Sequence, residues 1–159
     1  MPKIILETKI KAPIDRVFDL ARSIDLHTQS TSKTNERAVA GVTKGLIGLG
    51  ETVTWEARHL GFTQRLTSEI VVFDRPNHFR DSMQKGAFAR LDHDHFFEEV
   101  ARGTLMRDVF DFTSPFWVVG TIADLVFLKN YMRRFLLDRN RMIKQTAEGD
   151  DWKELVNIS

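Results

Sequence analysis

The sequence predicts a single α+β domain, in which a curved antiparallel sheet of six to seven strands wraps around one long C-terminal helix. Residues 35–113 alternate apolar and polar side chains in runs separated by glycine or proline, which is typical of successive strands. After Pro115, apolar residues instead recur at helical spacing. Strands and helices segregated in this way indicate the α+β class. The 159 residues suffice for one hydrophobic core.

The N-terminal segment predicts one strand followed by two short helices. The stretch Lys3–Lys11 alternates polar and apolar side chains, as a strand does. Pro13 suits the first turn of a helix, where its missing N–H is harmless, and the apolar residues up to Arg22 fall on one helical face. A second short helix is expected from Asp25 and ends in the Ser/Thr-rich run at Ser30.

The strands of the middle segment are separated by turns. We expect hairpins at Leu60-Gly61, near Gly86 and at Ala101-Arg102. The stretch Gly41–Gly50 lacks the spacing of a phosphate-binding loop and does not precede a helix, so we interpret it as a strand connection.

The inner face of residues 78–84 depends on the turn near Gly86. A plain two-residue turn places Arg80 and Ser82 on the inner face. A bulge there instead places Phe79, Asp81 and Met83 inside, and we favour the bulge because it buries two apolar side chains.

The long helix is predicted from about Val119 to Lys144, on the order of 40 Å at about 1.5 Å per residue. A twisted sheet curves away from a straight helix of that length, so we expect a gap between them. Residues 1–147 then form one domain, and residues 148–159 form an acidic tail that is expected to fray. The basic side chains of the helix predict a solvated face, or alternatively a surface for an acidic partner or a membrane. They are Lys129, Arg133, Arg134, Arg139, Arg141 and Lys144.

Composition excludes several classes of function. Lys and Arg number 23 and Asp and Glu number 22, and this net charge of +1 gives no reason to expect a nucleic-acid partner. The chain has no cysteine, which excludes disulfides, zinc–thiolate sites and a Cys nucleophile. The N-terminal segment lacks the apolar region of a secretory signal, and the most apolar run, residues 116–128, is too short to span a bilayer. We therefore expect a cytoplasmic protein without stable membrane insertion.

Five stretches of the sequence occur in a characteristic order. They are Ala12–Ala21 (APIDRVFDLA), Trp55–Gly61 (WEARHLG), Asp74–Asp81 (DRPNHFRD), Gly86–Phe96, and Thr104–Asp108 (TLMRD) followed by Pro115. In this order and spacing, residues 3–145 resemble the START-related polyketide cyclase and lipid transport superfamily (SRPBCC), whose members have the helix-grip fold. The resemblance implies a largely apolar cavity beneath the C-terminal helix, which takes a lipid, a polyketide or another small hydrophobic molecule.

The resemblance does not imply one activity, because members of this superfamily include cyclases, transfer proteins and pure binders. The chain also departs from the family in one loop, where the proline is often followed by a glycine in the form P-x-G. Here Phe116-Trp117 follows Pro115. We expect this pair to form either a lid over the cavity or a tip that touches a membrane.

Two histidines form the sharpest candidate site. His93 and His95 share one face of a predicted strand, because successive side chains of a strand alternate between faces. With Ala101-Arg102 as a two-residue turn, His95 lies opposite Asp108. The same face is otherwise apolar, so we expect it to be the concave one. Its apolar residues are Leu91, Phe97, Met106, Phe110 and Phe112.

A carboxylate opposite an imidazole fixes the tautomer of the ring and raises its pKa, as a general base requires. Three interpretations follow for His95 and Asp108. They satisfy each other at the cavity wall, they anchor a ligand, or they catalyse a reaction. In the catalytic interpretation His95 is the base, Asp108 orients it and His93 polarises a carbonyl group.

The same histidines nearly match a metal-binding pattern. The spacing G-x6-H-x-H-x3-E, from Gly86 to Glu99, comes close to the first cupin motif, in which His93, His95 and Glu99 would be ligands. The first spacing is six residues rather than five, and no histidine follows His95. The sequence therefore predicts neither a metal nor another cofactor.

The predicted function is to bind a small hydrophobic ligand between sheet and helix. The alternative is a cyclase- or dehydratase-like enzyme that uses His95 and Asp108. A third hypothesis is an interaction role, with a second copy of the chain as an open possibility for a partner. The expected ligand-binding residues are Trp55, His59, Leu66, Ser68, Leu91, His93, His95, Met106, Phe110, Phe112, Leu125 and Met132.

Overall fold

The computed structural model describes residues 2–114 and 122–156, with the side chains of residues 122–124 left aside. In this part of the chain, seven strands form one antiparallel sheet in the order β1-β7-β6-β5-β4-β3-β2. The strands are β1 (Lys3–Ile10), β2 (Arg37–Gly41), β3 (Thr52–His59), β4 (Phe62–Asp74), β5 (His78–Lys85), β6 (Arg90–Val100) and β7 (Gly103–Thr113). The curved antiparallel sheet predicted from the alternation of residues 35–113 is confirmed.

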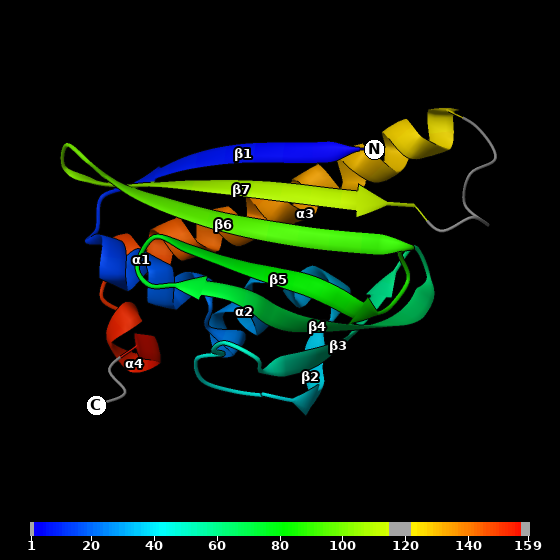
Figure 1. Cartoon of the computed structure of the whole chain (residues 1–159), viewed down its shortest axis with the longest axis horizontal. Helices are drawn as coiled ribbons and strands as arrows, with labels where there is room; N and C mark the ends of the chain where they lie inside the picture. Colours follow the sequence, from blue (N-terminus) through cyan, green and yellow to red (C-terminus); the bar gives the residue numbers. More distant parts are fainter. Residues whose placement is uncertain (1, 115–121, 157–159) are drawn as a thin grey trace.

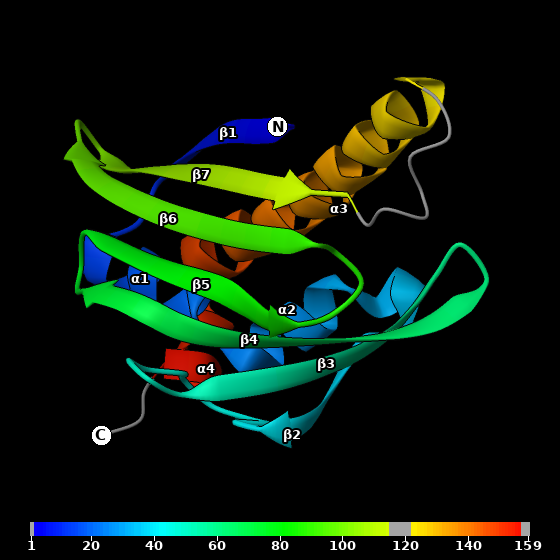
Figure 2. The same cartoon turned by 45° about the vertical axis from the view of Figure 1, so that its right-hand side comes forward.

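One long helix lies across one face of this sheet, and two short helices lie on the same side (Figures 1 and 2). The helices are α1 (Ile14–Ala21), α2 (Ile24–Ser30), the short 3₁₀ helix η1 (Ser32–Thr34), α3 (Ile122–Glu148) and α4 (Trp152–Val156). The predicted helix-grip architecture is therefore confirmed. Phe116-Trp117, predicted to form a lid or a tip, lies outside the described residues. Among the described helices, none is both long enough and apolar enough to cross a membrane.

The hairpin between β6 and β7 has the predicted register. Ala101-Arg102 forms the turn, and Arg102 has a φ of 69°. As a result His95 pairs with Asp108, and His93 pairs with Phe110. The turn at Leu60-Gly61 is also confirmed, since His59 pairs with Phe62 and both turn residues have positive φ values.

The strand β5 turns the predicted side chains inward. Phe79 pairs with His95, and Asp81 pairs with His93. The connection from β5 to β6 contains one residue more than a plain two-residue turn near Gly86 would allow. This shift by one residue places Phe79 and Asp81 on the inner face, the same outcome as that expected from a bulge. Asp81 therefore reaches the inner face, although nothing in its local sequence marks it as functional.

The core is divided between two clusters of buried side chains. One gathers around Phe18 of α1, whose ring makes edge contacts with Phe73, Phe79 and Phe97. The other lies between β1, β6 and β7 and the middle of α3, where Leu136 is buried. Helix α3 thus contributes to both clusters on the face of the sheet that it covers, with Ile143 in the first and Leu136 in the second.

The C-terminal segment differs from the expected frayed tail. Residues Trp152–Val156 form α4, which packs against α1. The guanidinium of Arg16 lies 3.8 Å from the centre of the Trp152 ring. The segment is acidic, but three of its apolar residues pack against the core. They are Trp152, Leu155 and Val156.

Candidate functional site

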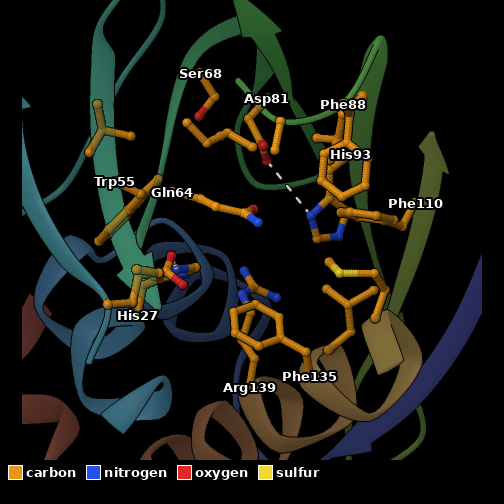
Figure 3. Close-up of a pocket in the computed structure, with 18 of the residues that line it drawn as sticks. His27, Trp55, Gln64, Ser68, Asp81, Phe88, His93, Phe110, Phe135 and Arg139 are labelled. Atoms are coloured by element: carbon orange, nitrogen blue, oxygen red, sulfur yellow. Dashed lines mark hydrogen bonds and ion pairs between the residues drawn. The ribbon is translucent and has the colours of Figure 1, made fainter. Parts of the chain in front are cut away.

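A cavity of about 210 Å³ lies between the concave face of the sheet and α3. Strands β3 to β7 line one side of the cavity and α3 lines the other, at the bottom of the view in Figure 3. Most of its wall is apolar or aromatic. The apolar lining includes Ile47, Val53, Trp55, Ala57, Leu66, Ile70, Phe79, Phe88, Leu91, Phe110, Leu128, Met132, Phe135 and Leu136.

Most residues expected to line the cavity are found there. They are Trp55, His59, Leu66, Ser68, Leu91, His93, His95, Phe110 and Met132. Met106 and Phe112 are not in its wall, because both side chains are completely buried in the two core clusters. Leu125 is also outside the wall, since it lies in the first turn of α3 and the cavity begins at Leu128.

The polar end of the cavity is formed by Asp81, His93 and His95. His95 Nε2 lies 2.9 Å from Asp81 Oδ2, and His93 Nδ1 lies 3.9 Å from the same oxygen. The two imidazole rings are neighbours, with centroids 3.8 Å apart. Figure 3 shows Asp81 and His93 facing each other across the upper part of the cavity. Both histidines are buried, whereas Asp81 is partly exposed to the cavity.

Asp108 lies behind the two histidines and contacts both of them. Its Oδ1 accepts a hydrogen bond from His93 Nε2 at 3.0 Å. The same oxygen is 3.0 Å from His95 Nδ1, although this contact lacks the alignment of a good hydrogen bond. Asp108 does not line the cavity, so it acts on the site through the imidazole rings.

Helix α3 completes the surroundings of Asp108. Asn140 Nδ2 donates to Asp108 Oδ2 at 2.7 Å. Arg139 is 4% exposed, and its guanidinium lies 3.6 Å from Asp108 Oδ1 while donating to the carbonyl oxygen of Ala21. The prediction that Arg139 belongs to a solvated basic face is therefore wrong. Its position on α3 faces the sheet, and buried partners compensate its charge.

These contacts separate the proton affinities of the two histidines. Burial raises the pKa of Asp108, but the hydrogen bond from His93 and the contact with His95 outweigh burial and keep this pKa well below its usual range. Burial lowers the pKa of His95, but Asp108 and Asp81 raise it more, so the net shift is upward. Burial and the neighbouring His95 lower the pKa of His93. His95 therefore holds a proton more readily than His93 does.

A second polar group lies across the cavity from the histidines. His27 Nε2 is 2.7 Å from Glu36 Oε1, and the His27 ring lies over Trp55 with ring centroids 4.1 Å apart. Gln64 projects between this group and the polar end in Figure 3. An elongated ligand would thus meet polar groups at two separated places.

His59 links the β3–β4 hairpin to the helix that covers the cavity. Its Nδ1 is 2.8 Å from the hydroxyl of Tyr131 on α3, and its ring also contacts Phe135. All three residues line the cavity. The sequence predicted His59 among the ligand-binding residues, but could not identify its partner on α3.

The residues that sequence reasoning missed come from elements that are remote in the chain. The sequence predicts Asp81 on the inner face and Arg139 on the basic face of the helix, but neither as a site residue, and no local pattern pairs His27 with Glu36. Glu99, the third residue of the near-cupin pattern, is exposed and is not in the cavity wall. The signal that could have found Asp81 is the choice of inner face for β5, which also places Phe79 inside.

No protein-family model and no curated protein sequence matches the chain. Solved structures do match it over nearly its whole length. A START superfamily protein from Mycobacterium smegmatis has 10% identity and a TM-score of 0.69, covering 92% of this chain and 97% of the other. The major latex-like protein 151 from Panax ginseng has 18% identity and a TM-score of 0.65, covering 93% and 98%. A protein from Thermus thermophilus, TTHA0849, has 19% identity and a TM-score of 0.70, covering 92% and 99%. At these identities the likeness shows the fold, and it confirms the START-like helix-grip fold.

Proposed function

We propose that the protein binds a small hydrophobic molecule that carries an oxygen-containing polar group. One observation supports this most directly: a largely apolar cavity carries a few titratable groups, with Asp81, His93 and His95 at one end and His27 with Glu36 across from them. Such cavities, apolar with few well-placed polar groups, are typical of small-molecule sites. The likeness to a START superfamily protein is consistent with this proposal.

The size of the cavity narrows the class of ligand. Its volume of about 210 Å³ is below the roughly 300–1,000 Å³ common for ligand sites. A compact aromatic or short acyl molecule fits this space better than a long-chain lipid does. Its apolar part would contact Leu66, Leu91 and Phe110, and its oxygen would accept or donate a hydrogen bond at the polar end.

Probe displacement and a blocked cavity test the binding proposal. Native mass spectrometry of the purified protein identifies any retained ligand, and fluorescence of anilinonaphthalene sulfonate measures filling of the apolar space. Leu66→Trp places a larger side chain in the cavity wall and is expected to weaken probe binding. Val71→Trp is the matched control, because Val71 is 40% exposed and is not in the wall. Equal binding by both variants, or no bound ligand or probe at all, would overturn the proposal.

A second candidate function is favoured by the orientation of the histidines. The predicted cyclase- or dehydratase-like reaction removes water from a β-hydroxy carbonyl compound. An imidazole takes a proton from the α-carbon, a C=C bond forms, and the hydroxyl group leaves as water with that proton. Both nitrogens of His95 face carboxylates, whereas His93 Nδ1 is beyond hydrogen-bond distance of Asp81. The geometry therefore favours His93 for proton transfer, which moves the predicted role of the base from His95 to His93.

The enzyme candidate has its own test. Wild-type protein, His93→Gln and His95→Gln are incubated with an aromatic β-hydroxy ketone, and loss of water is followed by mass spectrometry. Turnover by the wild type that both variants lose would support catalysis. Probe binding without turnover in the wild type would reject catalysis and leave the binding function in place.

A further inference from the structure

Three potential ligand atoms for a metal converge at the polar end of the cavity. His93 Nδ1 and His95 Nε2 lie 3.9 and 2.9 Å from Asp81 Oδ2, and one ligand atom from each of the three residues lies within 4.8 Å of the others. Metal bonds from such ligands are about 2.0–2.2 Å long. Small rotations of the side chains would therefore bring all three atoms onto one ion.

The opposite ring nitrogens are held in the way that metal-binding histidines require. Histidine ligands usually donate their second N–H group to a carboxylate, which fixes the tautomer and the ring orientation. Asp108 Oδ1 lies 3.0 Å from both His93 Nε2 and His95 Nδ1. Asn140 holds the other oxygen of Asp108 at 2.7 Å. His93 Nε2 donates to Asp108, and His95 Nδ1 lies beside the same oxygen without the alignment of a hydrogen bond. The remaining nitrogens, His93 Nδ1 and His95 Nε2, lie on the side of Asp81.

We propose that His93, His95 and Asp81 bind one divalent transition-metal ion such as Zn²⁺, and that Asp108 is the positioning residue. Two imidazoles and one carboxylate are a ligand set that suits zinc and iron(II). Binding replaces the proton shared between His95 and Asp81 with the ion. The sequence predicted no metal because its spacing departs from the cupin motif and no histidine follows His95, and it did not identify Asp81 as a ligand.

Burial makes this cluster costly for a purely structural role. Taking charged carboxylates and imidazoles out of water can cost more free energy than their mutual contacts return. A structural pair would need only His95 and Asp108. Instead, His93 Nδ1 has no hydrogen bond in the part of the chain that the structure describes, and it is directed toward Asp81.

The proposed ion would have room for an exogenous ligand. Three protein ligands leave at least one coordination position, as in catalytic rather than structural zinc sites. His93, His95 and Asp81 all line the cavity, so this position would face it. Water, or an oxygen of a bound molecule, would occupy it. The metal proposal goes beyond the proposed function and does not depend on it.

Metal titration of chelator-treated protein tests the proposal. Calorimetry with Zn²⁺ is expected to give one ion per chain in the wild type, and Co²⁺ is expected to give the visible absorption bands of a protein-bound ion. Asp81→Asn and His93→Gln are expected to lose this binding. Asp108→Asn is expected to weaken it by about 10–100-fold, since it keeps all three ligands.

The matched control lies on the other face of the same strands. His78 Nε2 is 2.7 Å from Asp94 Oδ1, and neither residue lines the cavity. His78→Asn is therefore expected to bind Zn²⁺ as the wild type does. Circular dichroism of each variant verifies folding, and the wild-type cobalt spectrum does not depend on any variant.

Three outcomes would overturn the metal site. They are no stoichiometric binding of Zn²⁺ or Co²⁺ by the wild type, unchanged binding in folded Asp81→Asn and His93→Gln, or loss of binding in His78→Asn. The titration contains no apolar molecule, so its failure leaves the hydrophobic-ligand proposal intact. Conversely, a cavity that takes no apolar probe but binds Zn²⁺ rejects only that proposal.

Discussion

Asp108 on β7 pairs directly with His95 on β6, and its Oδ1 lies 3.0 Å from His95 Nδ1. The same carboxylate also accepts hydrogen bonds from His93 and Asn140, and it is fully buried. One side chain thus connects the sheet, the long helix and the polar end of the cavity. Stability and site geometry both depend on it.

Asp108→Asn is expected to lower the free energy of unfolding by about 3–5 kcal/mol, because it removes the negative charge that compensates buried histidine and arginine. Urea unfolding followed by circular dichroism measures this. Asp111→Asn is the control on the same strand, since Asp111 pairs with Lys3 and Arg90 near the surface and is expected to cost less than about 1 kcal/mol. Equal losses in the two variants would contradict the central role of Asp108.

His59 is expected to make stability fall in mild acid. Burial lowers the pKa of His59 below its usual 6.5, and Glu36 offsets only part of this effect. The unfolded chain therefore binds this proton as the pH drops below about 6.5, while the folded state resists it. The stability contributed by neutral His59 is present above that pH and is lost as the pH falls through the pKa of the folded state.

The comparison of wild type with His59→Gln isolates this contribution. Unfolding free energies are measured near pH 7.5 and near pH 5.5, and the wild type is expected to lose more stability between them than the variant does. An equal or larger loss in His59→Gln would show that protonation of His59 is not the cause.

Trp55 is expected to report on filling of the cavity. Its side chain is 9% exposed, lines the cavity and lies against His27. In a Trp117→Phe, Trp152→Phe variant, the emission of Trp55 alone should change when a compact aromatic ligand binds. Leu66→Trp would add a second fluorophore to this variant. Leu66→Phe is therefore used to reduce the cavity volume as the control. Bound ligand detected by mass spectrometry without any change in Trp55 emission would place the ligand elsewhere.

Trp152→Ala is expected to detach α4 without abolishing the fold. The ring contacts Arg16 at 3.8 Å, and an interaction of this kind is worth about 0.5–2 kcal/mol. Thermal unfolding should show a loss of that order. Lys153 lies on the same helix with an exposed side chain that pairs with Asp150, so Lys153→Ala is expected to change stability little. A loss no larger than that of Lys153→Ala would show that α4 contributes nothing to the domain.

Local patterns in the sequence predicted most of the architecture. The alternation in residues 90–113 and the two-residue turn at Ala101-Arg102 determined which side chains face inward and which pairs lie opposite. These features depend on neighbours a few residues apart, so strand geometry alone determines them. Composition was misleading at Trp152. The acidic residues around it indicated a frayed tail, whereas Trp152, Leu155 and Val156 pack against the core.

The sequence could not predict which inward-facing side chains line the cavity and which are packed in the core. Met106 and Phe110 have the same orientation on β7, yet only Phe110 reaches the cavity. Alternation states which face a side chain occupies, but the height and tilt of α3 above that face decide whether it meets a helix or a space. Arg139 shows the same limit from the helix side, because a charged residue among other charged residues carries no local sign of burial.

The sequence by itself determined the fold class, the β6–β7 register and the meeting of His95 with Asp108, because backbone alternation and turn length act over short distances along the chain. Only the tertiary structure decided that Asp81, from β5, faces both histidines and that Arg139 and Asn140, from α3, close around Asp108. Those contacts join residues up to 32 positions apart, as Asp108 and Asn140 are, and they depend on how a long helix packs across a curved sheet.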